Sequence, residues 1–275
     1  MERNEIIDVF AEFLRDAYYK DLALAIREGK KSIQIDFSLL DKFNPKLADL
    51  VLEKPEETIE LLKRSIKEID LPQKADLNIR FFNIPDTNKV RIRDIRAEHI
   101  GKLLCVDGIV KRASEVRPEV SEIIFQCPEC GKRIDVIQTE KDKMIRLPSK
   151  CPECGCRRGF KQVDQKLYDA RWIAIEEPFE ITTGERPSEI MVYLKEDLTS
   201  PKMRNKTDPG NRIKVIGVLK EIPRRTIRGR RTRQMEILLD ANNIEAVEIE
   251  WEELVISPED ERKIKKLAKD PHIYD

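Results

Sequence analysis

Four cysteines in two identical clusters are the residues whose type and spacing point most directly to chemistry in this 275-residue chain. The clusters are Cys127-Pro-Glu-Cys130 and Cys151-Pro-Glu-Cys154, and 20 residues separate them. Each C-x-x-C turn aims two thiolates at one point, so two facing turns supply the four sulfurs of a tetrahedral Zn²⁺ site. The spacing predicts one structural zinc ion per chain, bound by Cys127, Cys130, Cys151 and Cys154, with no open position for catalysis.

Two disulfides or a redox dithiol would use the same residues, but the duplicated pairs and the absence of a secretory signal favour zinc. Gly131 and Gly155 follow the second cysteine of each pair, where the turn needs a residue that tolerates positive φ. Cys156 is either a spectator or a competing fifth thiol. Cys105, in the strand-like run Leu-Leu-Cys-Val, is predicted to be a buried and inert core residue.

The charge of the chain is informative only in its distribution. Lys and Arg number 52 and Asp and Glu number 52, so the formal net charge is zero and predicts no nucleic-acid partner. Between Ile222 and Met235, however, there are six arginines and no acid, whereas residues 243–261 hold eight acids and no base. The chain therefore carries opposed patches that cancel.

The arginines fall at the tip of a predicted β-hairpin over residues 213–247. Guanidinium groups cannot leave water without partners, so the tip is expected to project from the fold. Contact with phosphate is the simplest use of such a tip, through counterion release and bidentate hydrogen bonds. A solvated loop or a salt-bridged subunit contact would have the same composition.

Further basic residues lie in loops of the same region: Lys111, Arg112, Arg117, Arg186 and Lys202. They could outline a groove across an oligonucleotide-binding barrel, although any one such cluster alone is more often ordinary surface. Aromatic residues make up only 6% of the chain, which favours contact with the backbone of a nucleic acid over base stacking. Trp172 alternates with apolar neighbours and is predicted to pack in a strand core.

The sequence pattern of the elements that would position these residues changes after Pro72 from helical to β-like. Before it, helical periodicity covers residues 2–28, 39–52 with a break at Asn44-Pro45, and 55–69, with a short β run at 32–36. After it, short β-branched-rich runs predict an all-β domain with strands at 90–95, 103–110, 123–125, 134–137, 171–175, 190–194, 212–219 and 235–247.

The predicted fold is therefore α+β and multidomain. A helical bundle occupies residues 1–88, and an OB-fold β-barrel is formed by residues 89–126 and 161–250. A zinc module, residues 127–160, is inserted in the barrel, and residues 251–275 form a linker helix. No apolar run reaches the roughly 18–20 residues that span a bilayer, which favours a cytoplasmic protein without a membrane partner. No G-x-x-x-x-G-K-[ST] motif is present, so no ATP site of that type and no catalytic residues are expected.

The order of these features resembles the N-terminal portion of archaeal minichromosome maintenance (MCM) replicative helicases. The resemblance covers the whole chain. Three features carry it most specifically: the segment Gly108-Ile-Val-Lys-Arg-Ala-Ser-Glu-Val-Arg-Pro118, the four-cysteine spacing, and the closing run from Pro258 to Tyr274. The last resembles the linker that leads to the family's ATPase domain.

The resemblance implies a homo-hexamer or double hexamer that encircles single-stranded or double-stranded DNA in replication, close to the nucleoid of an archaeal cell. The barrel would form the collar of the ring, and the zinc modules would mediate contact between rings. Single-strand binding would fall to Arg117 and Arg186, with Lys111, Arg112 and Lys202 as weaker candidates. A basic hairpin lines the channel in the family, and the corresponding residues here are Arg225, Arg228, Arg230 and Arg231.

The resemblance also implies that the loop from Glu177 to Pro187 relays between the collar and the ATPase domain, which this segment lacks. The segment itself is then not an enzyme, whereas its full-length parent would be an ATP-dependent DNA helicase. The alternative is a free-standing OB-fold protein that binds single-stranded DNA and carries a zinc ribbon. A ring of about six chains would favour the collar, and a monomer would favour the alternative.

Overall fold

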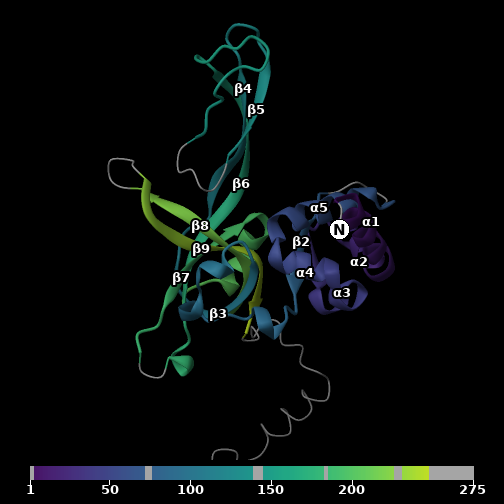
Figure 1. Ribbon diagram of the computed structural model, residues 1–275, viewed down its shortest axis with the longest axis vertical. Helices are drawn as coiled ribbons and strands as arrows, with labels where there is room; N and C mark the ends of the chain where they lie inside the picture. The colour runs from purple at the N-terminus through teal and green to yellow at the C-terminus, as the bar shows by residue number, and fades with distance from the viewer. Residues whose placement is uncertain (1–2, 72–75, 139–144, 183–184, 226–230, 248–275) are drawn as a thin grey trace, which may run out of the picture.

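The structure is a computed structural model, and it describes residues 3–71, 76–138, 145–182, 185–225 and 231–247. A helical bundle, a β-barrel and a long β-ribbon arm make up the described chain (Figure 1). The α+β class, with a four-cysteine module inserted in a barrel, is therefore confirmed. The predicted linker helix over 251–275 lies outside the described residues. No described helix is long and apolar enough to cross a membrane.

The bundle consists of five helices and two short parallel strands: α1 Arg3–Ala17, α2 Tyr19–Arg27, β1 Ser32–Asp36, α3 Phe37–Phe43, α4 Pro45–Glu53, α5 Pro55–Glu68 and β2 Asn78–Phe82. Pro45 and Pro55 stand in the first turns of α4 and α5, where a missing N–H costs nothing. The single helix predicted over 2–28 is wrong in one respect, because it breaks at Tyr18. The Tyr18 hydroxyl accepts a hydrogen bond from the backbone N–H of Asp36 at 2.8 Å, which ties the break to the end of β1.

Strand β2 was not predicted from the sequence. Its run Asn78-Ile-Arg-Phe-Phe82 alternates polar and apolar residues over only four positions, which is a short signal. In the structure the polar Arg80 is buried together with its neighbours Ile79 and Phe81. The strand is covered on both faces, so its burial does not follow the period-2 pattern of a half-exposed strand.

Five strands close the barrel: β3 Leu103–Ala113, β6 Lys161–Glu176, β7 Glu189–Lys195, β8 Arg212–Arg225 and β9 Arg231–Ala246. They pair in the order β3-β8-β9-β7-β6, and β6 returns to pair with β3. Within the described sheet, β7–β9 is the parallel pair and the other pairs are antiparallel. This is a five-stranded Greek-key barrel of the OB type.

Three short helical turns lead from β2 of the bundle to the first barrel strand: η1 Asp86–Asn88, η2 Ile92–Asp94 and η3 Ala97–His99. Three more elements connect barrel strands: η4 Phe179–Ile181, η5 Glu196–Thr199 and α6 Pro201–Lys206. The strand predicted over 90–95 is wrong, because η2 occupies this stretch. Ile92 and Ile95 both pack into the barrel core. Their spacing of three residues suits a 3-10 turn, in which residues i and i+3 share one side.

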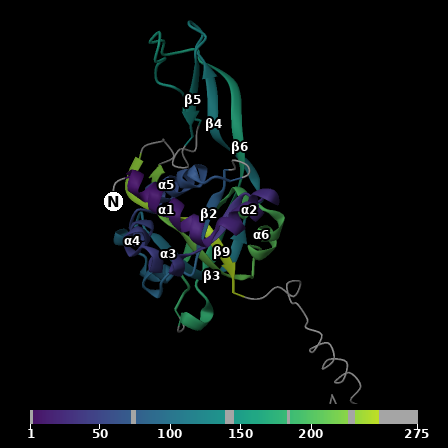
Figure 2. The same cartoon turned by 90° about the vertical axis from the view of Figure 1, so that its right-hand side faces the viewer.

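The arm is a three-stranded ribbon that rises from the barrel (Figures 1 and 2). It is built from β4 Arg117–Gln126, β5 Arg133–Ile137 and the first half of β6. The predicted strands at 123–125 and 171–175 are thus short parts of a 10-residue and a 16-residue strand. The polar, exposed residues of the arm concealed the rest of both strands from a search for apolar runs.

The bundle packs directly on the outside of the barrel, since Leu103, Cys105, Ile216 and Val218 join the bundle core. A β-bulge at Asn242 strengthens the junction. The Asn242 side chain accepts from the backbone N–H of Phe81 at 2.8 Å and donates to the carbonyl of Ile79 at 2.9 Å. The Asn242 amide thereby makes the hydrogen bonds to the β2 backbone that a neighbouring strand would otherwise make.

Candidate metal centre and nucleic-acid interface

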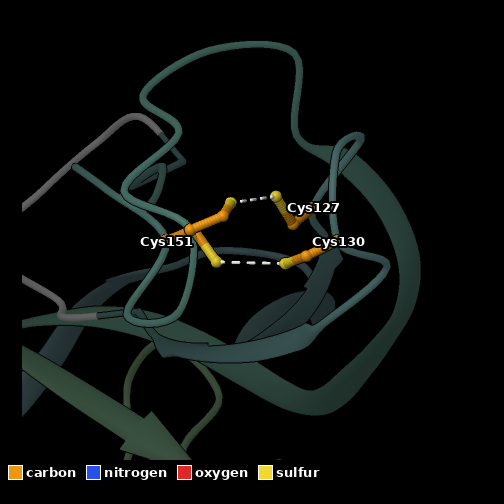
Figure 3. Close-up of side chains that lie close together, drawn as sticks. Cys127, Cys130 and Cys151 are labelled. Atoms are coloured by element: carbon orange, nitrogen blue, oxygen red, sulfur yellow. Dashed lines mark hydrogen bonds between the residues drawn. The ribbon is translucent and has the colours of Figure 1, made fainter.

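The four predicted zinc ligands converge at the far end of the arm. Their sulfur atoms all lie within 4.8 Å of one another, and the cluster is the one metal-binding group found among the described residues. Cys127 Sγ lies 3.4 Å from Cys154 Sγ, and Cys130 Sγ lies 3.5 Å from Cys151 Sγ. Figure 3 shows Cys127 and Cys130 on one turn facing Cys151 on the other.

The two turns that carry the cysteines have the same backbone geometry. Gly131 N–H donates to the carbonyl of Cys127 at 3.0 Å, and Gly155 N–H donates to that of Cys151 at 3.1 Å. The φ angles of Gly131 and Gly155 are 71° and 74°, which confirms the predicted need for glycine. The repeated Cys-Pro-Glu-Cys-Gly sequence therefore folds into two matching knuckles that face each other.

Electrostatics in the cluster favour a cation. Hydrogen bonds from the backbone N–H groups of Cys130 and Glu129 lower the pKa of the Cys127 thiol to about 6. The pKa of Cys154 is instead raised to about 12, because the hydrogen bond from the Cys156 amide is outweighed by burial and by the neighbouring sulfurs. Four thiolates cannot be held together without a positive charge between them.

The donor set fits zinc. Zn–S bonds of about 2.3 Å in a tetrahedron place the sulfurs roughly 3.8 Å apart, close to the separations seen here. Cys127 and Cys151 are buried, and no open coordination position is left for a substrate. Cys156 lies outside the cluster, and its thiol donates to the carbonyl of Arg158 at 3.2 Å. Burial raises the pKa of Cys105 to about 11, in keeping with an inert core thiol.

The OB barrel carries long insertions in two of its connections. The link from the first strand, β3, to the second, β6, contains β4, β5 and the metal cluster. The link from the fourth strand, β8, to the fifth, β9, is the arginine-rich hairpin. OB folds bind oligonucleotides with the face of strands 2 and 3 and with these same two connections. The arm and the hairpin therefore flank the expected ligand face, the outer side of β6 and β7.

Two of the predicted DNA-binding residues lie on that outer side. Arg117 pairs in register with Ala170 of β6, and Arg112 pairs with Ala174. Four residues along a strand separate these rows, a distance of about 13 Å. Both arginines are exposed, and Arg117 makes no ion pair among the described residues.

Lys111 and Arg112 are already partnered. Lys111 Nζ lies 2.9 Å from Glu176 and 3.2 Å from Glu189, and the hydrogen bond to Glu176 is the main cause that raises the pKa of Lys111. Arg112 lies 3.3 Å from Glu189. The two pairs with Glu189 are exposed on both sides and of small net strength, so a phosphate could displace them. The Glu176 side chain is half-buried. Arg117 is left as the cation of these three that makes no ion pair among the described residues.

Arg186 lies away from Arg117. It is exposed in the loop between β6 and β7, which projects at the end of the barrel opposite the arm (Figure 1). The base of this loop is clamped, because the buried Glu177 carboxylate accepts from Arg93 Nε at 3.0 Å and from Ser188 N–H at 3.2 Å. Sequence reasoning assigned no role to Arg93, and no local pattern links two residues 84 positions apart.

Lys202 is exposed on α6, beside the turn that joins β3 to β4. The buried Arg171 fixes that corner, donating to Ser114 O at 2.9 Å and to Thr207 Oγ1 at 2.7 Å. Arg171 was read in the sequence as the start of a strand only. Its polar role could be suspected solely from the charge inside an otherwise apolar run.

The backbone of the hairpin brings Arg225 and Arg231 into register as direct cross-strand partners. Arg228 and Arg230 lie outside the described residues.

Comparisons with known proteins agree with this geometry. The family described as the MCM N-terminal domain matches residues 7–96, and the family described as the MCM OB domain matches residues 91–223. A crystal structure of the N-terminal domain of an archaeal MCM superposes with a TM-score of 0.72 at 25% identity, covering 89% of this chain and 99% of that one.

Curated relatives match over a part of their own length. A minichromosome maintenance protein of Saccharolobus solfataricus is 28% identical over 98% of this chain and 41% of its own. A DNA replication licensing factor MCM6 of Arabidopsis thaliana is 32% identical over 70% of this chain and 26% of its own. The chain thus spans less than half the length of these relatives. With both domain matches and the shared fold in hand, the chain belongs to the MCM family and comprises its N-terminal and OB domains.

Proposed function

We propose that this chain is the DNA-binding and ring-forming N-terminal collar of a replicative helicase of the MCM family. It binds single-stranded DNA through the outer face of its OB barrel and through the basic hairpin. The observation that carries the proposal is the placement of the arm and the hairpin in the two connections that OB folds use for nucleic acid. The ring and the role in replication rest on the family membership.

The metal of the four-cysteine cluster is proposed to be a structural Zn²⁺, one per chain. It would hold Cys127, Cys130, Cys151 and Cys154 and supply folding energy to the arm, with no part in chemistry. Elemental analysis of the native protein should give one zinc per chain, and a preparation that is ordered in the arm without stoichiometric metal would refute this.

The hairpin and the barrel face are proposed to act on different lengths of DNA. Arg117 can hold the short strand that fits one barrel, whereas Arg225, Arg228, Arg230 and Arg231 can contact a longer strand threaded through the ring. Arg117 lies beside Ala170, where β6 passes from the arm into the barrel, and Arg186 lies beyond Glu176 at the other end of the barrel part of β6, so a strand that reaches both must cross the barrel. Lys111, Arg112 and Lys202 contribute to the surrounding positive field.

The test combines particle mass with salt titration. Light scattering should give a particle of about six chains or a multiple of it, without ATP hydrolysis. Removing one arginine that neutralises a phosphate should lower the slope of log K against log salt by about 0.7 on a single strand. Arg117→Ala should show this on short oligonucleotides and Arg228→Ala with Arg230→Ala mainly on long ones.

Arg27→Ala is the matched control, since Arg27 is an exposed arginine on α2 of the bundle. It should leave both slopes unchanged. A monomer that binds short single strands would overturn the collar and support the free-standing single-strand-binding protein. Unchanged affinity and slope in every arginine variant, with the particle intact, would show that these arginines are solvated surface.

A further inference from the structure

Trp172 was expected in the core of a strand, but the structure places it outside the barrel. Strand β6 directs Ile173 and Ile175 into the barrel core. Trp172 alternates with them and joins a small separate cluster with Ala170 and Tyr193. It is half-buried, on the face of β6 and β7 that OB folds turn toward an oligonucleotide.

Basic side chains flank Trp172 on this face. Ala170, two residues before it, pairs with Arg117 on one side and with Lys195 on the other. Ala174, two residues after it, pairs with Arg112. Residues that pair directly across strands share one face of a sheet, so the Trp172 indole lies between the rows of Arg117 and Arg112.

The indole is held in place by its neighbours. Its ring centroid lies 4.4 Å from that of Tyr193, with 39° between the planes. Tyr193 is fully buried, and its hydroxyl donates to Glu119 at 2.6 Å and lies 2.8 Å from the hydroxyl of Tyr168. A stacking residue fixed in this way loses little conformational entropy on binding.

The surroundings suit a base better than a charged ligand. Met191 on β7 is 37% exposed and sits one row from Trp172 on the same face. An apolar centre with cations on both sides matches a chain of flat bases joined by phosphates. The Arg112–Glu189 pair at the edge is exposed and weak enough to yield to a phosphate.

We propose that Trp172 is a base-stacking residue, on which one base of a bound single strand stacks while neighbouring phosphates contact Arg117 and Arg112. The proposal deepens the function proposed above and rests on it. It differs from the expectation of pure backbone contact, because it assigns part of the affinity to the base itself.

The experiment compares a short oligothymidylate with an abasic strand of the same length, on the wild type and on Trp172→Leu. Stacking on an aromatic side chain strengthens binding per base by roughly 5- to 150-fold, so the wild type should prefer the strand with bases by a factor in that range. Trp172→Leu keeps an apolar side chain over Tyr193 and should lose most of this preference. Trp172→Phe should retain part of it.

Salt dependence separates the two kinds of contact. Trp172→Leu should keep the wild-type salt slope, whereas Arg117→Ala should lower the slope on both strands and keep the preference for bases. A second measurement needs no change at Trp172. The chain has two tryptophans, so Trp251→Phe leaves Trp172 alone, and its fluorescence should be quenched by oligothymidylate and not by the abasic strand.

Three outcomes would overturn the proposal. An equal preference for bases in the wild type and in Trp172→Leu would show that Trp172 only packs. A fall in particle mass in Trp172→Leu with the preference unchanged would show that the face is a contact between copies of this chain. Failure of the wild type to bind either strand would overturn the proposed function as well, and is thereby distinguished from the first two.

Discussion

Strand β6 runs through two regions of unlike construction. Residues 170–176 belong to the barrel and lie between other strands, and five of these seven residues are buried. Residues 161–169 belong to the arm, and all but one are exposed. Apart from the cysteines, the described part of the arm buries only Ile123 and Phe125. The barrel has an extensive apolar core, whereas the arm has the four-cysteine cluster in place of one, although they share a strand.

This difference explains why the arm needs a metal site. A ribbon with two buried apolar side chains cannot offset the conformational entropy of ordering its residues. Structural Zn²⁺ in zinc-finger peptides contributes an apparent binding free energy of about 10–16 kcal/mol at pH 7. The arm can therefore extend far from the barrel without a core of its own, provided that the metal is bound.

The largest expected effect is loss of the arm on removal of the metal. Cys127→Ser, or a strong chelator, should abolish stoichiometric zinc and expose the backbone amides of residues 127–160 to hydrogen exchange. Barrel and bundle amides should keep their protection, because their cores contain no metal ligand. Cys156→Ser is the matched control and should keep its zinc. Equal loss of protection throughout the chain would contradict the separation of the two regions.

The next largest effect is expected away from the arm, at the junction between the bundle and the barrel. Asp197 pairs with the buried Arg80, which joins β2 of the bundle to the barrel. Asp197→Ala leaves a buried guanidinium without its carboxylate and should lower the free energy of unfolding by about 3–5 kcal/mol. Denaturant titration followed by helix circular dichroism measures it.

The zinc content of Asp197→Ala should be unchanged, which sharpens the contrast with Cys127→Ser. Asp76→Ala is a suitable control, because Asp76 pairs with Lys67 at an exposed position. A surface pair of this kind contributes about 0–1 kcal/mol. A loss in Asp197→Ala no larger than in Asp76→Ala would show that the junction depends on apolar contacts alone.

A more local effect is expected at the Asn242 bulge. Asn242→Ala removes the amide that donates to Ile79 O and accepts from Phe81 N–H, and leaves both groups buried. Each unsatisfied backbone group costs about 1–3 kcal/mol, so β2 amides should exchange faster while arm amides do not. Unchanged exchange along β2 would mean that water or a backbone shift replaces the side chain.

The smallest effect concerns pH and the loop between β6 and β7. Burial alone would raise the pKa of Glu177, but N–H groups of Arg93 and Ser188 and the Arg93 guanidinium outweigh it and hold the pKa below its usual value. Because the folded pKa is lowered, this contribution to stability is present above the unfolded pKa of about 4.3 and is lost as pH falls through the folded pKa. Proteolysis within residues 177–188 should therefore rise below about pH 4.

Glu177→Gln should remove that pH dependence, since its amide does not titrate in this range. The loop should then be cleaved at a similar rate above and below about pH 4. A variant that still shows the acid-induced rise would place the titrating group elsewhere.

Prediction from the sequence succeeded where one local pattern is enough. The paired C-x-x-C turns and the helix starts at Pro45 and Pro55 follow from neighbouring residues. It was wrong at residues 90–95, where β-branched residues form a 3-10 turn. This turn places both Ile92 and Ile95 against the barrel core. It also missed β2, since the alternation of this five-residue strand extends over only four positions and is a weak signal.

The sequence by itself determined the four-cysteine cluster that could hold a metal ion, the fold class and the opposed charge patches, because spacing and periodicity act over a few residues. Only the tertiary structure decided which basic residues stay unpaired. Glu176 and Glu189 pair with Lys111 and Arg112, whereas Arg117 makes no ion pair among the described residues. The barrel also places Trp172 on its outer side. The alternation within one strand shows that Trp172 and Ile173 face opposite ways, but only the closed barrel determines which of the two sides is the interior.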